Sequence, residues 1–424
     1  MRILHVIDSL DPAGGGPPRV AVQLAATMAK GGHAVRLLSR RLPGESGDAQ
    51  TVGTDGGGSG LSAFAHVPGL EEVERLSVDM PAGWRGFVAG RLRESLHRWV
   101  SESDVVHLHG VWDVLLLRVA SACRELGVPY VVRPAGMLDP WSLGQRWLKK
   151  RLALLIGYRR MLDGAAFVQA LNADERQFVE RLGLDSPVEV IPNGTFVEWL
   201  ERPRERGRFR SQHARLGERP YVLFLSRLHY KKGLDYLAEA FRLLASRHPD
   251  VMLVVAGPEE GAGEAFAARV AELGLSERVL MPGPLYGEAK LDALVDATCF
   301  CLPSRQEGFS VAIIEALAMG TPVVISEPCH FPEVASAGAG AVVPLHAERI
   351  AGALEEMLMD AGLRARRAAA GVKLIREHYT WPRIAERCVE AYRAHGAGGG
   401  SDAGGRGRGA DAAGREVVRM PTAG

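Results

Sequence analysis

Short apolar segments alternate with helical patterns along most of the chain, and this alternation is what most constrains the fold. Residues 3–7, 35–38 and 104–109 are typical of buried strands, and residues 20–30 and 114–126 are typical of the helices between them. A helix after each strand returns the chain to the same end of the sheet, so successive strands pair in parallel. The sequence therefore predicts an α/β fold with doubly wound parallel sheets.

The alternation is interrupted once, near residue 196. A turn at residues 192–194 is followed by a charged stretch at residues 198–218, and a new apolar strand begins at Tyr221. A chain of 424 residues is also too long for one ordinary core. We therefore predict one domain over residues 1–195 and a second over residues 196–380.

Five further segments complete the predicted organisation. Residues 84–100 and 143–162 are predicted as helices, and residues 381–394 as an amphipathic helix near the end of the chain. Residues 43–62 are glycine-rich and polar, which is typical of a mobile surface loop. Residues 396–424 contain mainly Gly, Ala and Arg with few large apolar residues, so this tail is expected to be disordered.

Composition excludes several classes of protein. The 51 basic residues nearly balance the 50 acidic ones, whereas a nucleic-acid-binding protein usually has a strong basic excess. The five cysteines are odd in number and form no CxxC pair, which favours a reducing, cytoplasmic location and argues against a structural zinc site. The N-terminus has the pattern of a strand rather than a signal peptide, and no apolar run approaches the roughly 20 residues that span a bilayer.

The chemistry is concentrated in one strand-loop-helix unit at residues 297–320. An apolar strand leads into a polar loop that contains Glu307, and the following helix contains Glu315. Free amides at a helix N-terminus bind anions, and Glu315 would lie on the order of 8 Å beyond them. Two carboxylates on either side of a bound phosphate fit the hydroxyls of a sugar-diphosphate-ribose. Two acids at this spacing also occur by chance, so the spacing alone does not decide the function.

This unit resembles the motif Pro-Ser-x-x-Glu-Gly-Phe-Gly-x-x-x-x-Glu-Ala of the GT-B glycosyltransferases of the large retaining family 4, also called glycosyl transferases group 1. Ser310 replaces the last glycine of the loop, which keeps the backbone amide but hinders close approach of a phosphate. The resemblance covers residues 1–395. It implies two Rossmann-like domains that face each other across a cleft. It also implies that helix 381–395 packs back on the first domain, which presents the acceptor, while the second domain holds the nucleotide sugar.

Two cations follow the first strand of the second domain. Arg227 and Lys232 lie five residues apart around a strand-to-helix turn and can converge on one diphosphate. The alternative is a solvated charged loop. The family has Arg and Lys at these two points, and the resemblance implies that they neutralise the leaving nucleoside diphosphate; Lys231 is a weaker candidate.

By the same resemblance, Glu315 holds the ribose hydroxyls and Glu307 holds the hydroxyls of the donor sugar. The backbone amides of Gly308, Phe309 and Ser310 are expected to bind phosphate or sugar oxygens. These five residues and the two cations form the predicted donor site.

A glycine cluster at residues 14–16 follows the first strand. A dinucleotide site would require GxGxxG here and an acid after the second strand, and neither is present. A simple turn is the alternative interpretation. In the family a Gly-Gly pair in this register closes over the donor diphosphate, and Gly15 and Gly16 match it.

Two histidines end the strand at residues 104–109. His107 and His109 point to the same face if both remain in the strand. The resemblance implies that His109 lines the sugar site near the carbon where transfer occurs, and that His107 is structural. A structural role is the alternative for both, and no third ligand lies nearby in sequence to complete a zinc site.

The acceptor is the least constrained part of the prediction. Residues 133–141 resemble a subgroup of the family that builds surface polysaccharides, although Ala135 stands where many members have His or Arg. A saccharide or lipid-linked saccharide is therefore the expected acceptor. Residues 145–160 combine basic and apolar residues, so contact with the inner membrane face is a candidate, and an ordinary surface helix is the alternative.

The resemblance implies a metal-independent enzyme that transfers a glycosyl unit from a nucleotide diphosphate sugar to an acceptor hydroxyl with retention, in polysaccharide or glycoconjugate biosynthesis. The leaving phosphate oxygen takes the acceptor proton, so no cofactor or dedicated base is expected. Two alternatives remain: a sugar-nucleotide epimerase with the same architecture, and a non-catalytic protein that only binds nucleotide sugars.

Overall fold

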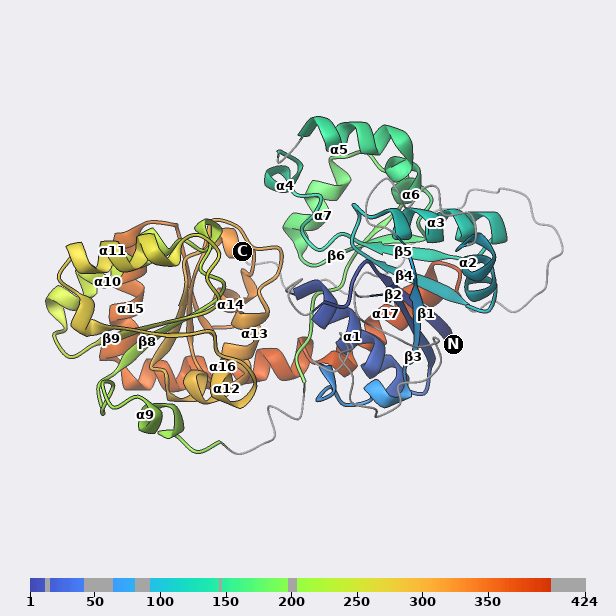
Figure 1. Ribbon diagram of the computed structural model, residues 1–424. Coiled ribbons are helices and arrows are strands. Elements are labelled where there is room, and N and C mark those ends of the chain that lie inside the picture. The colour runs from blue at the N-terminus through green and yellow to red at the C-terminus, as the bar shows by residue number, and fades with distance from the viewer. Residues whose placement is uncertain (12–15, 42–63, 81–91, 145–146, 197–203, 398–424) are drawn as a thin grey trace.

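Two α/β domains lie side by side in the computed structural model (Figure 1). It describes residues 1–11, 16–41, 64–80, 92–144, 147–196 and 204–397. One sheet has seven strands in the order β3-β2-β1-β4-β5-β6-β7, and the other has six in the order β10-β9-β8-β11-β12-β13. All of the strand pairs within the described sheets are parallel, which confirms the predicted fold class.

The first sheet is built from the N-terminal half of the chain. Its strands are β1 (Arg2–Ile7), β2 (Ala34–Arg40), β3 (Glu74–Val78), β4 (Val105–His109), β5 (Tyr130–Arg133), β6 (Phe167–Ala170) and β7 (Val188–Val190). Helices α1 (Gly16–Lys30), α2 (Leu92–Ser101), α3 (Val114–Leu126) and α7 (Ala173–Glu180) cover it, with a short turn η3 (Leu70–Glu72). The central strands β4 and β5 are buried along their whole length, as expected for parallel strands covered on both faces.

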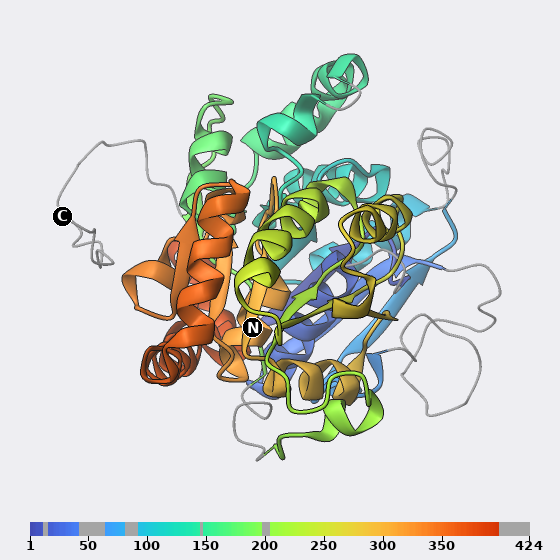
Figure 2. The ribbon, with the colours of Figure 1, turned by 90° about the vertical axis from the view of Figure 1, so that its left-hand side faces the viewer.

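The second sheet contains β8 (Tyr221–Leu225), β9 (Met252–Ala256), β10 (Val279–Gly283), β11 (Cys299–Leu302), β12 (Val323–Ser326) and β13 (Gly340–Val343). The helices around it are α9 (Arg208–Gln212), α10 (Leu234–Arg247), α11 (Gly263–Glu272), α12 (Gly287–Asp296), α13 (Val311–Ala318), α14 (Glu333–Ser336), α15 (Ala347–Met359) and α16 (Ala361–His378). Single turns η6 (Tyr230–Lys232), η7 (Ser276–Arg278) and η8 (Glu327–Cys329) lie in the connections. Figure 2 views the molecule from the side of this domain.

The chain passes between the domains at two places that touch each other. The backbone N–H of Thr195 donates to the carbonyl of Tyr379, and the N–H of Trp381 donates to the carbonyl of Thr195, both at 2.8 Å. Helix α17 (Trp381–Ala394) then continues into the first domain and packs against α1 (Figure 1). A Cβ on Gly194 would lie 2.9 Å from Trp381, so the crossing is tightly packed.

The predicted long helix over residues 143–162 is wrong. The described parts of this segment form α4 (Pro140–Gly144), α5 (Trp147–Ala153), the π-helical turn η5 (Leu154–Tyr158) and α6 (Arg159–Asp163). Gly157 has φ 139°, which is not a helical value. Residues other than glycine rarely adopt it. The apolar periodicity is continuous across this glycine, so the sequence pattern does not show the break.

Several other expectations lie partly or wholly outside the described residues. These are the loop at 43–62, the start of the helix at 84–100 and the tail beyond Ala397. The five cysteines are buried free thiols. Within the described ranges, no helix has the length and apolar character to cross a bilayer.

Candidate active site

Two glycines hold the loops at the carboxyl edge of the second sheet against each other. Gly233 has φ 67°, and a Cβ there would lie 1.9 Å from the carbonyl oxygen of Pro303. A Cβ on Gly257 would lie 1.8 Å from the carbonyl oxygen of Ser226. Only glycine permits these approaches. The segment after β8, which carries the two predicted cations, is thereby fixed beside the loop after β11, which carries Glu307.

Lys232 and Glu307 form a buried ion pair. Lys232 donates from Nζ to Oε1 of Glu307 at 2.6 Å, and the hydroxyl of Ser304 donates to the same oxygen at 2.6 Å. Both charged side chains are largely excluded from solvent. A pair of this kind needs good geometry to offset its loss of hydration, and these contacts supply it. The structure thus brings two of the predicted donor-site residues into direct contact.

Arg227 lies at the same edge but is more open. Its guanidinium donates to Glu260 at 2.7 Å, and half of the side chain (51%) is exposed. Burial lowers the pKa of Lys231, and the nearby charges of Lys232 and Arg227 lower it further, whereas Asp139 raises it. Arg227, Lys231 and Lys232 therefore lie close enough at this edge of the sheet for the charges of the other two to lower the pKa of Lys231.

Helix α13 starts where the sequence predicts, with Ser310 as its N-cap. The first amides of a helix have no partner within it, so they are available to an anion. Glu315 is buried one turn further along and accepts a hydrogen bond from Nζ of Lys290, on α12, at 2.5 Å. Lys290 was not predicted from the sequence as a site residue. The sequence feature that could have indicated it is its spacing of three and four residues from Ala293 and Leu294, which puts Lys290 on their face of the helix. A lysine buried on such a face requires an acidic partner.

The side chain of Phe309 anchors the loop rather than facing the predicted ligand. Its ring centroid lies 5.2 Å from that of Phe331 and 5.9 Å from that of Tyr379. Aromatic pairs at these distances pack favourably. Phe309 is therefore still expected to contribute to donor binding through its backbone amide, as predicted, and not through its ring.

The first domain contacts this loop directly. Asn172, the N-cap of α7, donates from Nδ2 to the carbonyl of Gly308 at 2.6 Å. A Cβ on Gly136 would lie 3.5 Å from the Cα of Gly308, and Gln306 donates to the carboxylate of Asp139. The predicted donor loop thus lies at the meeting point of the two domains.

A small pocket of about 190 Å³ occupies this meeting point. His330 from the second domain lies on its wall, with Nδ1 at 2.6 Å from the carboxylate of Asp174 in the first domain. Its described lining residues come from both domains: Gly136, Asp139, Pro140, Trp141, Asn172, Glu175, Phe178, Gln306, Glu307, Gly308 and His330. Of the predicted site residues, Glu307 and Gly308 line this pocket.

A buried carboxylate shapes the first-domain wall. Glu175 accepts hydrogen bonds from the amides of Gly136 at 2.5 Å and Leu171 at 2.7 Å, and burial raises its pKa. Ala135 (φ 52°) and His330 (φ 53°) are the two non-glycine residues with positive φ in the described chain. Both lie at this interface, and strained backbone of this kind is typical of functional sites. Asn172 and Glu175 were not predicted from the sequence, because only folding brings them to the loop of Gly308.

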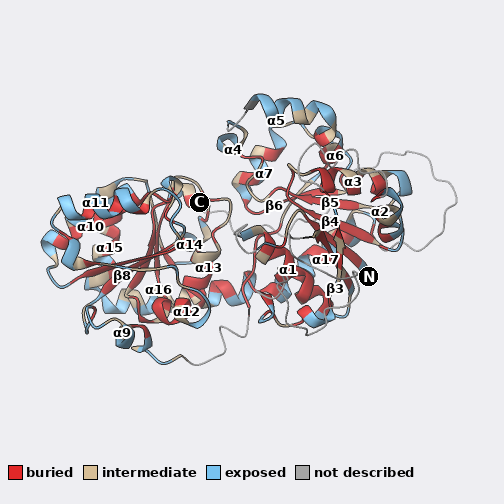
Figure 3. Cartoon of the chain, in the orientation of Figure 1, coloured by how far each residue is buried: buried red, intermediate tan, exposed pale blue. Residues whose placement is uncertain are grey.

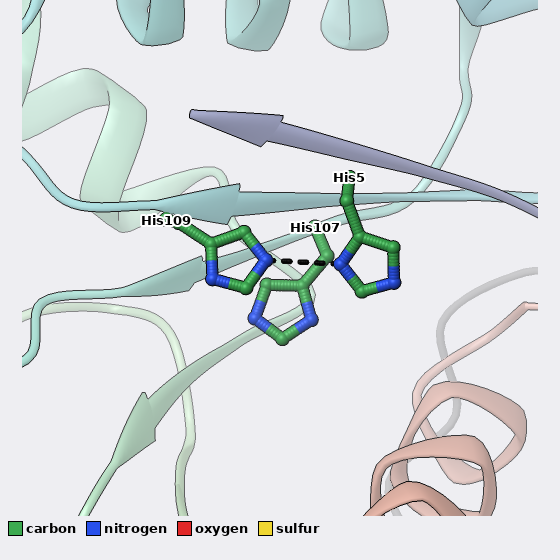
Figure 4. Close-up of side chains that lie close together, drawn as sticks. All are labelled: His5, His107 and His109. Carbon is green, nitrogen blue, oxygen red and sulfur yellow. Dashed lines mark hydrogen bonds between the residues drawn. The ribbon is translucent and has the colours of Figure 1, made fainter. Parts of the chain in front are cut away.

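His109 lies at the end of β4 in a cluster of three histidines (Figure 4). Its Nε2 is 2.9 Å from Nδ1 of His5 on the neighbouring strand β1. His107 and His109 share one face of β4 as predicted, with ring centroids 4.4 Å apart. His107 forms a 2.5 Å hydrogen bond with the hydroxyl of Tyr392 on α17, which fits its predicted structural role.

The histidine cluster was not predicted as a set of three, because His5 is distant in sequence and is brought opposite His107 by strand pairing. One ring nitrogen of each histidine lies within 4.8 Å of the others, which is the spacing of a candidate metal site. However, the rings of His107 and His109 are within 5° of parallel. A metal ion lies in the plane of each imidazole that binds it, so stacked rings do not converge on one ion. The absence of a metal from the reaction stays a prediction.

The glycine pair of the first domain is only partly described. Gly15 lies outside the described residues, and Gly16 is the first residue of α1. A Cβ at Gly16 would meet no atom within 4 Å. Its predicted contact with the donor diphosphate stays a prediction.

Comparisons with known proteins agree with this architecture. Residues 205–373 match the family model of glycosyl transferases group 1, and residues 15–194 match that of the glycosyl transferase 4-like domain. The chain is 30% identical to the phosphatidyl-myo-inositol mannosyltransferase of Mycobacterium leprae, over 91% of this chain and 94% of that protein. It is 27% identical to the GDP-mannose:cellobiosyl-diphosphopolyprenol alpha-mannosyltransferase of Xanthomonas campestris, over 93% and 97% of the two chains.

A solved structure shows the same fold. The Anabaena protein HepE in complex with UDP and glucose superposes with a TM-score of 0.71 at 19% identity, covering 93% of this chain and 100% of that one. Such structural neighbours are GT-B glycosyltransferases. The fold, the two family matches and the full-length relatives agree, and the chain belongs to the group 1 family of glycosyltransferases.

Proposed function

We propose that this enzyme transfers a glycosyl unit from a nucleotide diphosphate sugar to an acceptor hydroxyl, with retention of configuration and without a metal ion. The observation that carries the proposal is the buried contact between Lys232 and Glu307 beside the N-terminus of α13. It combines a cation for a phosphate, a carboxylate for sugar hydroxyls and a set of helix amides in one place. The second domain would therefore hold the donor.

In the proposed reaction, the bond between the anomeric carbon and the phosphate oxygen breaks, and its electron pair remains on the phosphate. The acceptor oxygen attacks the same face of the sugar, and its proton passes to the departing phosphate oxygen. Arg227, Lys232 and the amides of α13 stabilise the negative charge that develops on the diphosphate. No protein base is then needed.

Other residues would orient the two substrates. Glu315 would accept hydrogen bonds from the ribose hydroxyls. To do so, it must share or exchange its hydrogen bond with Lys290. Glu307 would bind the donor sugar. His109 contributes a buried Nδ1 without a hydrogen-bond partner among the described residues. Nε2 of His5 and Nε2 of His107 are in the same state, so the role of His109 at the sugar site is proposed from the family resemblance.

We further propose that the acceptor is a saccharide or a lipid-linked saccharide in polysaccharide or glycoconjugate synthesis in the cytoplasm. The relative from Xanthomonas is named for a diphosphopolyprenol-linked acceptor, which supports this class. The pocket between the domains, lined by Trp141 and Asn172, is the candidate entry for the acceptor.

The test is product analysis. The purified enzyme is incubated with a panel of labelled nucleotide sugars, with and without saccharide and polyprenol-linked acceptors, and each reaction is run both with and without a chelator. A labelled glycoside whose anomeric configuration matches that of the donor, determined by NMR, supports the proposal. Release of an isomerised sugar without acceptor would show an epimerase, and donor binding without turnover on any acceptor would show a binding protein. Turnover that stops with the chelator would contradict metal independence.

A further inference from the structure

The segment from α5 into η5 exposes an apolar face to solvent. Of the ten large hydrophobic residues that are exposed in the described chain, four lie between residues 148 and 156: Leu148, Leu152, Leu155 and Ile156. Leu155 and Ile156 are 81% and 60% exposed. Their spacing of four, seven and eight residues from Leu148 puts them on one side of a helix. Such a stripe normally packs on the core, but Figure 3 shows the outer surface of α5 as mainly exposed.

A cationic groove adjoins this apolar face. It has a volume of about 1130 Å³ and lies between α3 and the segment from α5 to α6. Leu154, Leu155 and Ile156 contribute to its wall. Five arginines line it, against two aspartates, and the charged lining residues are Arg118, Arg124, Arg151, Arg159, Arg160, Asp163 and Asp185. Asp163 already accepts from Arg159 at 2.9 Å. The balance of the groove is therefore strongly positive although the whole chain carries only +1.

We propose that this surface, formed by the apolar face of residues 148–156 and the arginine groove, docks the enzyme on a bilayer that contains anionic phospholipid. Leu152, Leu155 and Ile156 would enter the boundary between headgroups and acyl chains, and the arginines would contact lipid phosphates. Apolar and cationic side chains on one face are the combination that an anionic membrane surface complements. In the views of Figures 1 and 2, α5 also stands away from the body of the first domain.

A second copy of the chain is the competing occupant, and the charges argue against it. In a twofold dimer through this face, each arginine groove would lie close to its own copy, and like charges would repel. The position of the apolar face of residues 148–156 also suits a lipid-linked acceptor. The wall of the interdomain pocket at Trp141 belongs to α4, which precedes α5 in the chain. The link to a lipid-linked acceptor rests on the proposed function, whereas the proposal of membrane binding does not.

The experiment is sedimentation of the full-length protein with vesicles. One set contains phosphatidylcholine and phosphatidylglycerol in equal parts, and the other contains phosphatidylcholine alone. We expect binding to the anionic vesicles that weakens with added salt. Leu155→Glu combined with Ile156→Glu should lower the partition coefficient at least about tenfold, because two charges replace inserted apolar groups. Arg151→Glu combined with Arg160→Glu should do the same for the anionic vesicles.

Met359→Glu is the matched control, because Met359 is an equally exposed apolar residue (68%) on α15 of the other domain. It should leave binding unchanged. Thermal melting followed by circular dichroism checks that each variant is folded. Donor turnover with a water-soluble acceptor should persist in the membrane variants, which separates failure of docking from failure of the proposed reaction.

Two results would overturn docking on a bilayer. One is equal sedimentation of the wild type and the Leu155→Glu, Ile156→Glu variant. The other is a wild-type dimer in analytical ultracentrifugation that becomes a monomer in this variant while neither protein binds vesicles. The second result would assign the face to self-association.

Discussion

At the scale of single residues, the candidate site consists of charges that neutralise one another before any ligand arrives. Glu315 and Lys290 face each other at 2.5 Å with little access to solvent. Removing one member of a buried pair leaves the other without a partner, which is more costly than replacing both. The pair is therefore expected to matter for stability as well as for donor binding.

Lys290→Met should lower the free energy of unfolding of the second domain by about 3 kcal/mol. Lys290→Met combined with Glu315→Leu should recover most of this loss, because both buried charges are then absent. The measurement is urea denaturation followed by far-ultraviolet circular dichroism. An unchanged midpoint for the single variant would show that the pair is solvated in solution.

Arg227→Ala should lower kcat/KM for glycosyl transfer by about 10²-fold, because it removes a charged donor that acts on the developing diphosphate charge. Arg242→Ala is the matched control. Arg242 lies in the same domain, is similarly exposed (45%) and also pairs with a glutamate, at 3.0 Å. Steady-state kinetics should separate the two variants while their melting temperatures agree. Equal activity of the two would remove Arg227 from the proposed mechanism.

The buried histidines make the stability of the first domain depend on pH. Burial lowers the pKa of His5 to about 3 from an ordinary value of 6.5, and it lowers the pKa of His107 and His109 well below that value. Between the lowered pKa of the folded protein and the ordinary pKa of 6.5, the histidines bind protons in the unfolded chain but not in the folded protein. Stability is therefore full above pH 6.5 and falls as the pH drops toward 3, by up to about 1.4 kcal/mol per pH unit for each histidine.

Unfolding measured at a series of pH values tests this. His5→Gln should flatten the dependence below pH 6.5, whereas His378→Gln, at an exposed position, should leave it unchanged. A wild-type stability that stays constant from pH 6.5 to 5 would mean that the cluster is already protonated or hydrated in the native state.

At the scale of elements, the sequence predicted what depends on local pattern and missed what depends on long-range packing. The shared face of His107 and His109 follows from the period of a strand, and Ser310 as the start of α13 follows from a loop that runs into a helical pattern. The edge strands β3 and β13 were not predicted, because short edge strands lack a long apolar run. The third histidine and Lys290 were missed because their partners are distant in sequence.

The break at Gly157 is an element-scale feature that can be tested directly. Gly157→Ala should destabilise the first domain by about 1 kcal/mol or more, because φ 139° is strained for a residue with a Cβ. A Cβ there would meet Leu117 only at an ordinary 3.5 Å, so the cost is conformational rather than steric. Gly144→Ala, within α4 and without close neighbours, should be neutral or stabilising. Thermal melting compares the two, and equal effects would indicate a continuous helix in solution.

At the scale of the whole molecule, the domains are joined in two different ways. Where the chain crosses between the domains, Thr195 is held by backbone hydrogen bonds to Tyr379 and Trp381, so this crossing can act as the hinge. The contacts on the active-site side are a few polar pairs, such as Asn172 with Gly308 and Asp174 with His330. Interfaces of this size and polarity permit domain motion. The polar pairs therefore hold a closed arrangement that substrates must enter.

Asp174→Ala combined with His330→Ala should open the ligand-free protein while leaving each domain intact. We expect a larger radius of gyration in small-angle X-ray scattering, with no change in the circular dichroism spectrum. Added nucleotide sugar should reverse the change if the donor bridges the domains. A weakened contact also shifts the population toward the open form. The KM for the acceptor should then rise more than the KM for the donor, which we propose binds mainly to the second domain. Glu333→Ala, also on the second domain near this face, provides a control for loss of charge alone. Identical scattering curves for the wild type and the double variant would place the closing force elsewhere, in the packing of α17 on the first domain.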